Sequence, residues 1–163
     1  MLVLGIDPGT ATTGYGLVRE NQRGDLQLVE YGTVLTPAGL EQEKRLVMLF
    51  DRLSEIIVLH QPDCGAVEKL FFSRNVTTAI SVGQARGVAL LSMAQHAMTI
   101  AEYTPMQVKQ AVSGYGGADK KQVQIMVRAI LGMEELPEPD DAADALAIAI
   151  CHLHSYRWQM AGQ

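Results

Sequence analysis

Acidic residues occupy three places where the local sequence predicts a rigid attachment. Asp7 follows a short apolar run and precedes Pro-Gly, and Glu68 ends a second short apolar run. Such a run is typical of a buried strand, so each carboxylate is expected at the end of a strand. A third group of acids, Asp140, Asp141 and Asp144, begins a helix-forming segment. A single Asp at a turn is often only a cap, so a functional site is indicated only if these acids lie close together in the fold.

If these carboxylates converge, they form a site made only of oxygen donors. A set without histidine or cysteine selects Mg²⁺ or Mn²⁺ rather than zinc. Two such ions, about 4 Å apart, would bind the attacking and leaving oxygens during phosphodiester hydrolysis. Asp144 lies three residues after Asp141 and four after Asp140, and both spacings place two carboxylates on one helical face. Because the surrounding segment is apolar, a carboxylate there must be paired or bound to metal.

The elements expected to position these acids alternate between strands and helices. Short apolar runs indicate strands, and apolar stripes at steps of three and four indicate helices that cover a sheet. In chain order we expect three strands within residues 2–35, a helix over 46–60, a strand at Cys64–Glu68, a helix over 76–98, a strand at Thr99–Tyr103, and helices over 106–112, Lys120–Leu131 and from Asp140 onward. The pattern predicts one α/β domain, residues 1–163, with the acids at one edge of a mixed sheet.

Small residues recur every four positions in the long helix over residues 76–98, at Ala79, Gly83 and Gly87. This spacing permits close backbone approach. We therefore expect a tight helix–helix contact there, either within the fold or across a dimer.

Aromatic and cationic residues lie close to the acids in the chain. Phe71, Phe72 and Arg74 follow Glu68, and a ring exposed there would stack on a nucleobase or wedge between bases. The most basic region contains four cations in twenty residues, namely Lys109, Lys120, Lys121 and Arg128. These cations form either a solvated helical face or a phosphate-binding surface.

Composition sets limits on the class of protein. The chain has 163 residues, of which 48% are hydrophobic and 19% charged, as in an ordinary soluble domain. A net charge of −5 argues against binding of polyanions by bulk charge, but a local basic patch can coexist with an acidic metal centre. No membrane span and no secretion signal are recognised, and we expect a cytoplasmic location. Cys64 and Cys151 are expected to be reduced thiols.

Five motifs, in order, resemble the RuvC-type Holliday junction resolvases over nearly the whole chain. They are GIDPG (residues 5–9) with TGYG (13–16), VE (67–68) with Phe71, GQARG (83–87), QVKQ (107–110) and DAADALA (141–147). The resemblance implies an RNase H-like fold, in which helices flank a five-stranded mixed sheet made of a three-stranded antiparallel meander plus parallel strands. It also implies a homodimer that nicks two opposed strands of a four-way DNA junction symmetrically, during homologous recombination and DNA repair.

The resemblance also assigns roles to individual residues. The implied catalytic and metal-binding acids are Asp7, Glu68, Asp141 and Asp144. The implied DNA-binding residues are Phe71, Arg74, Lys109 and Lys120. Two alternatives stay open: Asp140 competes with Asp141, although the Asp-Ala-Ala-Asp spacing favours Asp141, and Phe72 competes with Phe71. The implied cofactor is Mg²⁺, with two ions per subunit and Mn²⁺ as a substitute, and the implied partner is a branch-migration motor complex of the RuvA and RuvB type.

Three other classes share part of this pattern. An actin-like or sugar-kinase-like ATPase also begins with a strand, an acid and Gly-Thr, but it needs two such domains around its nucleotide. A non-catalytic junction-binding module gains nothing from carboxylates that, without metal, repel the phosphates of DNA. An RNase H-like nuclease that acts on RNA–DNA hybrids differs only in its substrate.

Overall fold

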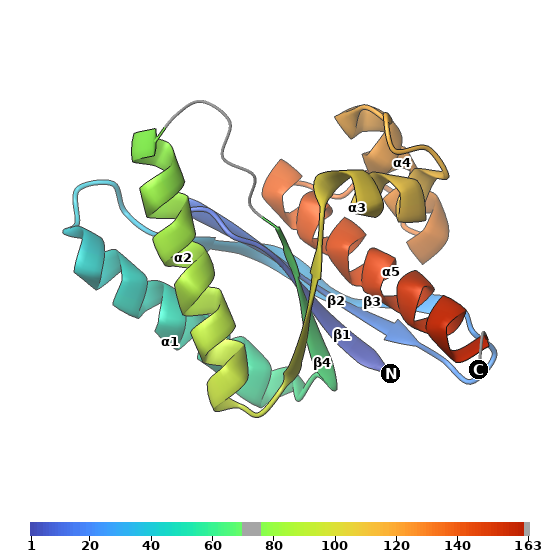
Figure 1. Cartoon of the computed structure of the whole chain (residues 1–163), viewed down its shortest axis with the longest axis horizontal. Coiled ribbons are helices and arrows are strands. Elements are labelled where there is room, and N and C mark those ends of the chain that lie inside the picture. Colours follow the sequence, from blue (N-terminus) through green and yellow to red (C-terminus); the bar gives the residue numbers. More distant parts are fainter. Residues whose placement is uncertain (70–75, 162–163) are drawn as a thin grey trace.

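A computed structural model describes residues 1–69 and 76–161 of the chain. Five strands form a sheet in the order β3-β2-β1-β4-β5, and helices lie on both of its faces (Figure 1). This arrangement confirms the expected α/β fold with a five-stranded mixed sheet. Within the described residues, no helix is both long enough and apolar enough to cross a membrane.

The sheet combines antiparallel and parallel pairs. Its strands are β1 (Leu2–Asp7), β2 (Thr12–Glu20), β3 (Leu26–Leu35), β4 (Cys64–Glu68) and β5 (Thr99–Tyr103). The first three form the antiparallel meander, whereas β4 runs parallel to β1 and β5 runs parallel to β4. The register of β2 against β3 shifts between Leu17 and Val18, which leaves Val29 as the extra residue. β1 is buried from Leu2 to Ile6, because a central strand has neighbours on both edges and helices on both faces.

Two helical layers complete the core. They consist of α1 (Gln42–His60) and α2 (Val76–Gln95) on one face, and of α3 (Pro105–Ser113), α4 (Lys120–Leu131) and α5 (Asp140–Ala161) on the other. Alternate residues of β1 enter the two halves of the core. Leu4 and Ile6 pack with buried residues of α1 and α2, whereas Val3 packs with those of α4 and α5. Cys64 and Cys151 are buried free thiols, as expected.

Two helix boundaries differ from the expected ones by three or more residues, and α3 extends one residue beyond its expected range at each end. α1 begins at Gln42, four residues before the apolar stripe. The stripe does not indicate this first turn, because the turn carries no buried apolar residue. α2 ends at Gln95 rather than at residue 98, because Ala97 adopts a left-handed conformation and the amide of Met98 donates back to the carbonyl of Met93. α4 has its expected bounds, because the side chain of Asp119 caps its start and Gly132 terminates it.

The small residues of α2 do not make the expected contact within the fold. Among the described residues, a Cβ added to Gly83 or Gly87 would meet no atom of another element within 4 Å. The buried face of α2 instead carries Ala85, Ala89 and Met93, each with no exposed surface. Gly83 and Gly87 therefore lie on the opposite, open side of the helix.

Candidate active site

Asp7 and Glu68 end two neighbouring parallel strands. The pairing of β1 with β4 runs to Ile6 opposite Val67, and the next residue on each strand is an acid. Because parallel strands end at the same edge of a sheet, the two carboxylates belong to one edge. Both acids line a cavity of about 250 Å³ at that edge.

The first turns of α5 bring further acids to this edge, because glycines in the facing strands leave space for the helix backbone. A Cβ on Gly14 would lie 1.9 Å from the carbonyl oxygen of Asp141, and a Cβ on Gly5 would lie 2.1 Å from that of Ala145. A Cβ on Gly16 would lie 2.8 Å from a side-chain carbon of Leu146. No residue with a side chain fits at these positions without displacing the helix.

Sequence patterns alone do not assign these glycines a role beyond membership of the motifs. A signal was nevertheless present, because Gly14 and Gly16 alternate with period two and therefore share one face of β2. Glycine within a strand often marks the close approach of another backbone.

The cavity gathers residues from both strand ends and from three helices. Its lining contains three of the four expected acids and two of the expected cations. The lining residues are Asp7, Glu68, Pro105, Val108, Lys109, Lys120, Val123, Asp144, Ala147 and Ile148. Asp141 is half-buried on the first turn of α5, beside this lining. The expected acids and cations are thus brought together from five different elements.

The acids at the site perturb one another strongly. Burial, together with repulsion from Asp144, Glu68 and Asp141, raises the pKa of Asp7 from 3.8 to about 7, and Lys120 partly opposes this. Burial and the charge of Asp144 also raise the pKa of Glu68, against the lowering effect of Lys109. Several carboxylates that raise each other's pKa in a cavity indicate a site that lacks enough positive charge.

The contacts of Lys120 separate the environments of Asp140 and Asp141, the two neighbouring acids at the start of α5. Its ammonium nitrogen lies 3.2 Å from Asp140 Oδ2 and 3.0 Å from Asp144 Oδ2. Asp140 also accepts a hydrogen bond of 2.8 Å from Gln124 Nε2. The hydrogen bonds from Lys120 and Gln124 lower the pKa of Asp140. Asp140 thus faces α4, whereas Asp141 contributes to the repulsion felt by Asp7.

The carboxylate oxygens at the site are the groups that could bind a metal ion. The carboxylates of Asp7, Glu68, Asp141 and Asp144 form a hard, all-oxygen set that suits Mg²⁺ or Mn²⁺. As they stand, however, no three acidic, histidine or cysteine side chains within the described part of the chain form a group that could hold an ion. Lys120, which is paired with Asp144, supplies positive charge there. The donor chemistry and the mutual repulsion of the acids therefore fit a divalent cation, and its binding requires side-chain rearrangement.

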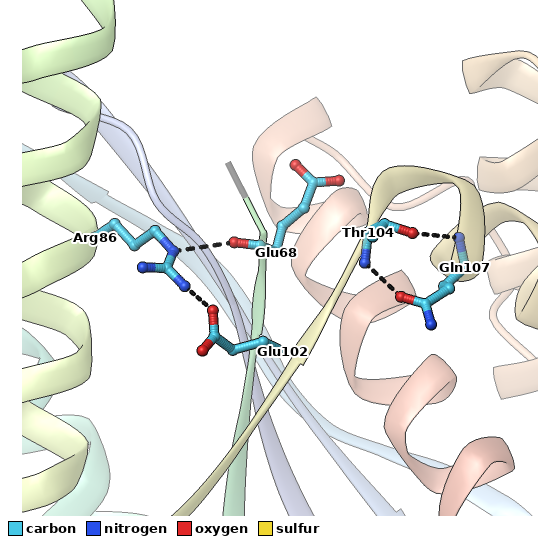
Figure 2. Close-up of polar contacts among 5 residues, drawn as sticks. All are labelled: Glu68, Arg86, Glu102, Thr104 and Gln107. Carbon is cyan, nitrogen blue, oxygen red and sulfur yellow. Dashed lines mark hydrogen bonds and ion pairs between the residues drawn. The ribbon is translucent and has the colours of Figure 1, made fainter. Parts of the chain in front are cut away.

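Lys109 is positioned by the rigid start of α3. Thr104 precedes the helix, and its hydroxyl accepts a hydrogen bond of 3.1 Å from the amide of Gln107. In return, the amide of Thr104 donates to Gln107 Oε1 at 2.8 Å, which completes the capping box (Figure 2). α3 follows β5 directly, so the cap fixes the start of the helix at the end of the strand. Lys109 and Glu68 both line the cavity.

Two of the expected DNA-binding residues, Phe71 and Arg74, lie outside the described residues. Phe72, the alternative to Phe71, also lies outside them. Their expected roles stay predictions.

The raised pKa of Asp7 predicts how stability depends on pH in EDTA. A carboxyl with a folded-state pKa of about 7 against an ordinary 3.8 contributes stability that is complete below pH 4 and lost as the pH rises to 7. Three pKa units at 1.36 kcal/mol each give a loss on the order of 4 kcal/mol. Urea unfolding of the natural protein and of Asp7→Asn should therefore agree near pH 4 and diverge by pH 8, with Asp7→Asn the more stable. A difference in unfolding free energy between the two proteins that does not change with pH would contradict the raised pKa of Asp7.

The fold and the position of the acids define the class of protein. A sheet in the order β3-β2-β1-β4-β5, with acids at the ends of β1 and β4 and on a helix packed across them, is the RNase H-like arrangement. A family model described as Crossover junction endodeoxyribonuclease RuvC matches residues 3–152. The chain therefore belongs to the RuvC family of crossover junction endodeoxyribonucleases.

Individual relatives agree with this membership. The Crossover junction endodeoxyribonuclease RuvC of Syntrophomonas wolfei is 58% identical over 157 residues, which are 96% of this chain and 91% of the relative. The structure of Thermus thermophilus RuvC is 38% identical, with a TM-score of 0.91 over 98% of this chain and 97% of that one. A second structure, T. thermophilus RuvC in complex with a Holliday junction substrate, has 35% identity and a TM-score of 0.89, over 97% of this chain and 96% of that one.

Proposed function

We propose that this protein is a structure-selective endonuclease that resolves Holliday junctions by hydrolysing phosphodiester bonds in two opposed strands, in homologous recombination and DNA repair. The observation that carries the proposal is the cavity in which Asp7, Glu68 and Asp144 meet Lys109 and Lys120. Membership of the RuvC family supports the choice of a DNA junction as the substrate, because one family structure contains a Holliday junction.

In this proposal the four acids Asp7, Glu68, Asp141 and Asp144 would hold Mg²⁺, with two ions per subunit and Mn²⁺ as a substitute. A divalent ion bound there would supply Lewis acidity to the scissile phosphate and lower the pKa of an attacking water. The chain's own contribution is to attach the carboxylates to two strand ends and one helix, so that their backbones are held in fixed positions while the side chains adjust to the ion. Asp140 is not part of the proposed ligand set, because Lys120 engages its Oδ2 and Gln124 its Oδ1, whereas Lys120 pairs with Asp144 through Oδ2.

The cations and the aromatic residue would bind the DNA. Lys109 and Lys120 lie in the cavity beside the acids, where an ammonium group can contact a phosphate oxygen next to the cut. If a phosphate and a metal ion draw Lys120 and Asp144 apart, the two groups exchange partners without leaving an uncompensated charge. Arg74 is proposed to contact the backbone and Phe71 to stack on or wedge between bases at the crossover.

The substrate also implies an oligomeric state and a cell compartment. Two symmetric cuts require two identical sites related by a two-fold axis, which an isologous homodimer provides. We propose such a dimer, acting in the cytoplasm together with a branch-migration motor complex of the RuvA and RuvB type. The open side of α2 at Gly83 and Gly87 is available for the interface, because nothing lies within 4 Å of either position within the described chain.

The proposed interface predicts an effect of a bulky residue on α2. Gly83→Leu should convert the dimer to a monomer in sedimentation velocity, while thermal unfolding stays cooperative because a Cβ at this position meets none of the described neighbouring atoms within 4 Å. Gly39→Leu is the matched control, since Gly39 also has open space around it. A Gly83→Leu protein that remains dimeric would place the interface elsewhere.

The proposed function is tested with a labelled synthetic four-way junction whose crossover can migrate, so that many sequences are sampled. Paired nicks at symmetric positions are expected in Mg²⁺, with none on linear duplex of the same sequence. Cutting of an RNA–DNA hybrid instead would favour the hybrid nuclease. Junction binding without cutting in either Mg²⁺ or Mn²⁺ would favour the non-catalytic module.

A further inference from the structure

Arg86 contacts the ends of two neighbouring strands at once. It lies in α2, and its side chain is 20% exposed. Its Nε donates a hydrogen bond of 3.3 Å to the backbone carbonyl of Glu68, and Nη2 forms an ion pair with the carboxylate of Glu102 in β5. Figure 2 shows both contacts, with the guanidinium between the helix and the two strands. The side chain thus joins α2, β4 and β5 through one planar group.

The end of β4 is the part of the sheet that needs such support. Pairing with β1 runs as far as Val67, so Glu68 lies one residue past it. On the other side Glu68 pairs with Tyr103, and the amide of Lys69 donates to the carbonyl of Tyr103 at 2.7 Å. With a neighbouring strand on one side only, the last residue of a strand opens more readily than its centre.

Arg86 and the carboxylate of Glu68 lie on opposite faces of the sheet. Val67 packs in the half of the core formed with α1 and α2, whereas Ala66 packs in the half formed with α5. Because side chains alternate along a strand, Glu68 points to the same side as Ala66, into the cavity. Figure 2 shows the Glu68 carboxylate directed away from Arg86. Arg86 therefore contacts the backbone of Glu68 from the face opposite to its carboxylate.

We propose that Arg86 is a positioning residue for junction cleavage, which fixes the backbone at the end of β4 so that Glu68 stays in place opposite Asp7. This role rests on the proposed function, in which Glu68 is one of the four acids. The two contacts require donors at a fixed separation, and the rigid guanidinium supplies them. A lysine at this position keeps the charge but cannot hold the carbonyl and Glu102 in the same geometry.

The test compares Arg86→Lys with Arg52→Lys. Arg52→Lys is the matched control, because it is the same chemical change at a residue of α1 that forms an exposed ion pair with Glu55. Arg86→Lys should lower the single-turnover cleavage rate at saturating junction about tenfold, since a misplacement of about 1 Å at a catalytic group can cost a hundredfold. Its junction Kd should stay within twofold of that of the natural protein. Arg52→Lys should change neither quantity.

Hydrogen exchange provides a readout that does not depend on cleavage. In Arg86→Lys the amide of Lys69 should exchange about tenfold faster, while amides in β1 and α5 keep their rates. Glu102→Gln, which leaves the Arg86 contact to the Glu68 carbonyl in place, should show smaller changes in both exchange and cleavage. It also provides a second test if Arg86→Lys folds poorly.

Distinct outcomes would overturn the role of Arg86 and the proposed function. Cleavage by Arg86→Lys at the natural rate would overturn the positioning role alone. The same holds if Arg86→Lys loses junction affinity and thermal stability but keeps its rate at saturation, because that result indicates a structural role only. Absence of any junction cleavage by the natural protein would overturn the proposed function, and the role of Arg86 in cleavage with it.

Discussion

Replacement of Asp7 by asparagine is expected to lower the single-turnover rate of junction cleavage by a factor of about a thousand or more. Asparagine has nearly the same shape but no charge, so it removes one of the carboxylates that would hold metal at the scissile phosphate. Loss of a single group that acts on the charge of a transition state costs about 10²–10³ in rate. Burial and the charges of the other three acids together raise the pKa of Asp7 to about 7, so its carboxylate lies close to all of them.

The same substitution should not weaken the fold. Asp7 is the acid whose charged form is opposed by burial and by three neighbouring carboxylates, so its neutral replacement relieves repulsion. Junction affinity should also be retained or increased, because one negative charge beside the phosphates is removed. The measurement is a gel assay of cleavage with 5′-labelled junction, together with a filter-binding Kd in Ca²⁺.

The control for Asp7→Asn is Asp51→Asn, the same change at an exposed position on α1, on the other face of the sheet. Asp51→Asn should cut at the natural rate. Cleavage by Asp7→Asn within tenfold of the natural rate would show that Asp7 is not a catalytic acid. A parallel loss of binding and of thermal stability would instead mean that Asp7 acts on the fold.

Gly5→Ala is expected to destabilise the fold strongly. The added Cβ would lie 2.1 Å from the carbonyl oxygen of Ala145 and 2.8 Å from the amide nitrogen of Ala149, both in the backbone of α5. Backbone atoms cannot rotate away as a side chain can, so α5 must move off the sheet. Overpacking of this kind costs about 3 kcal/mol or more, which corresponds to a fall in Tm of roughly 6–12 °C for a domain of this size.

Cleavage should fall together with stability in Gly5→Ala, because α5 carries Asp141 and Asp144 to the edge where Asp7 lies. Below the Tm of the variant, the rate at saturating junction should still be reduced at least about tenfold, as expected for a displacement near 1 Å. Gly39→Ala is the matched control, since a Cβ there meets nothing within 4 Å. A folded Gly5→Ala protein with natural stability and rate would contradict the close packing of α5.

Sequence patterns predicted the strand ends and helices well where burial enforces a period. β1 and β4 were recognisable as short apolar runs that end in an acid, because both strands are buried on both faces. The start of α1 at Gln42 was missed because its first turn carries no buried apolar residue. The end of α2 at Gln95 was missed because the left-handed residue that follows it is an alanine, Ala97, and not a glycine. Of the two contacts expected for the small residues of α2, the one within the fold is absent at Gly83 and Gly87 among the described residues, and the one across a dimer stays a prediction, since small residues permit close approach but do not require it.

The sequence by itself determined the family of the chain and which residues were candidates for carrying chemistry. It placed acids at two strand ends and on one helix, and cations on two other helices, because these residue types and periods are local properties of the chain. Only the tertiary structure decided which groups meet. It paired Lys120 with Asp140 and Asp144, seated α5 on glycine backbone, and set Arg86 behind Glu68. The physical reason is that ion pairs and close contacts depend on distances between elements far apart in sequence, which no local pattern encodes.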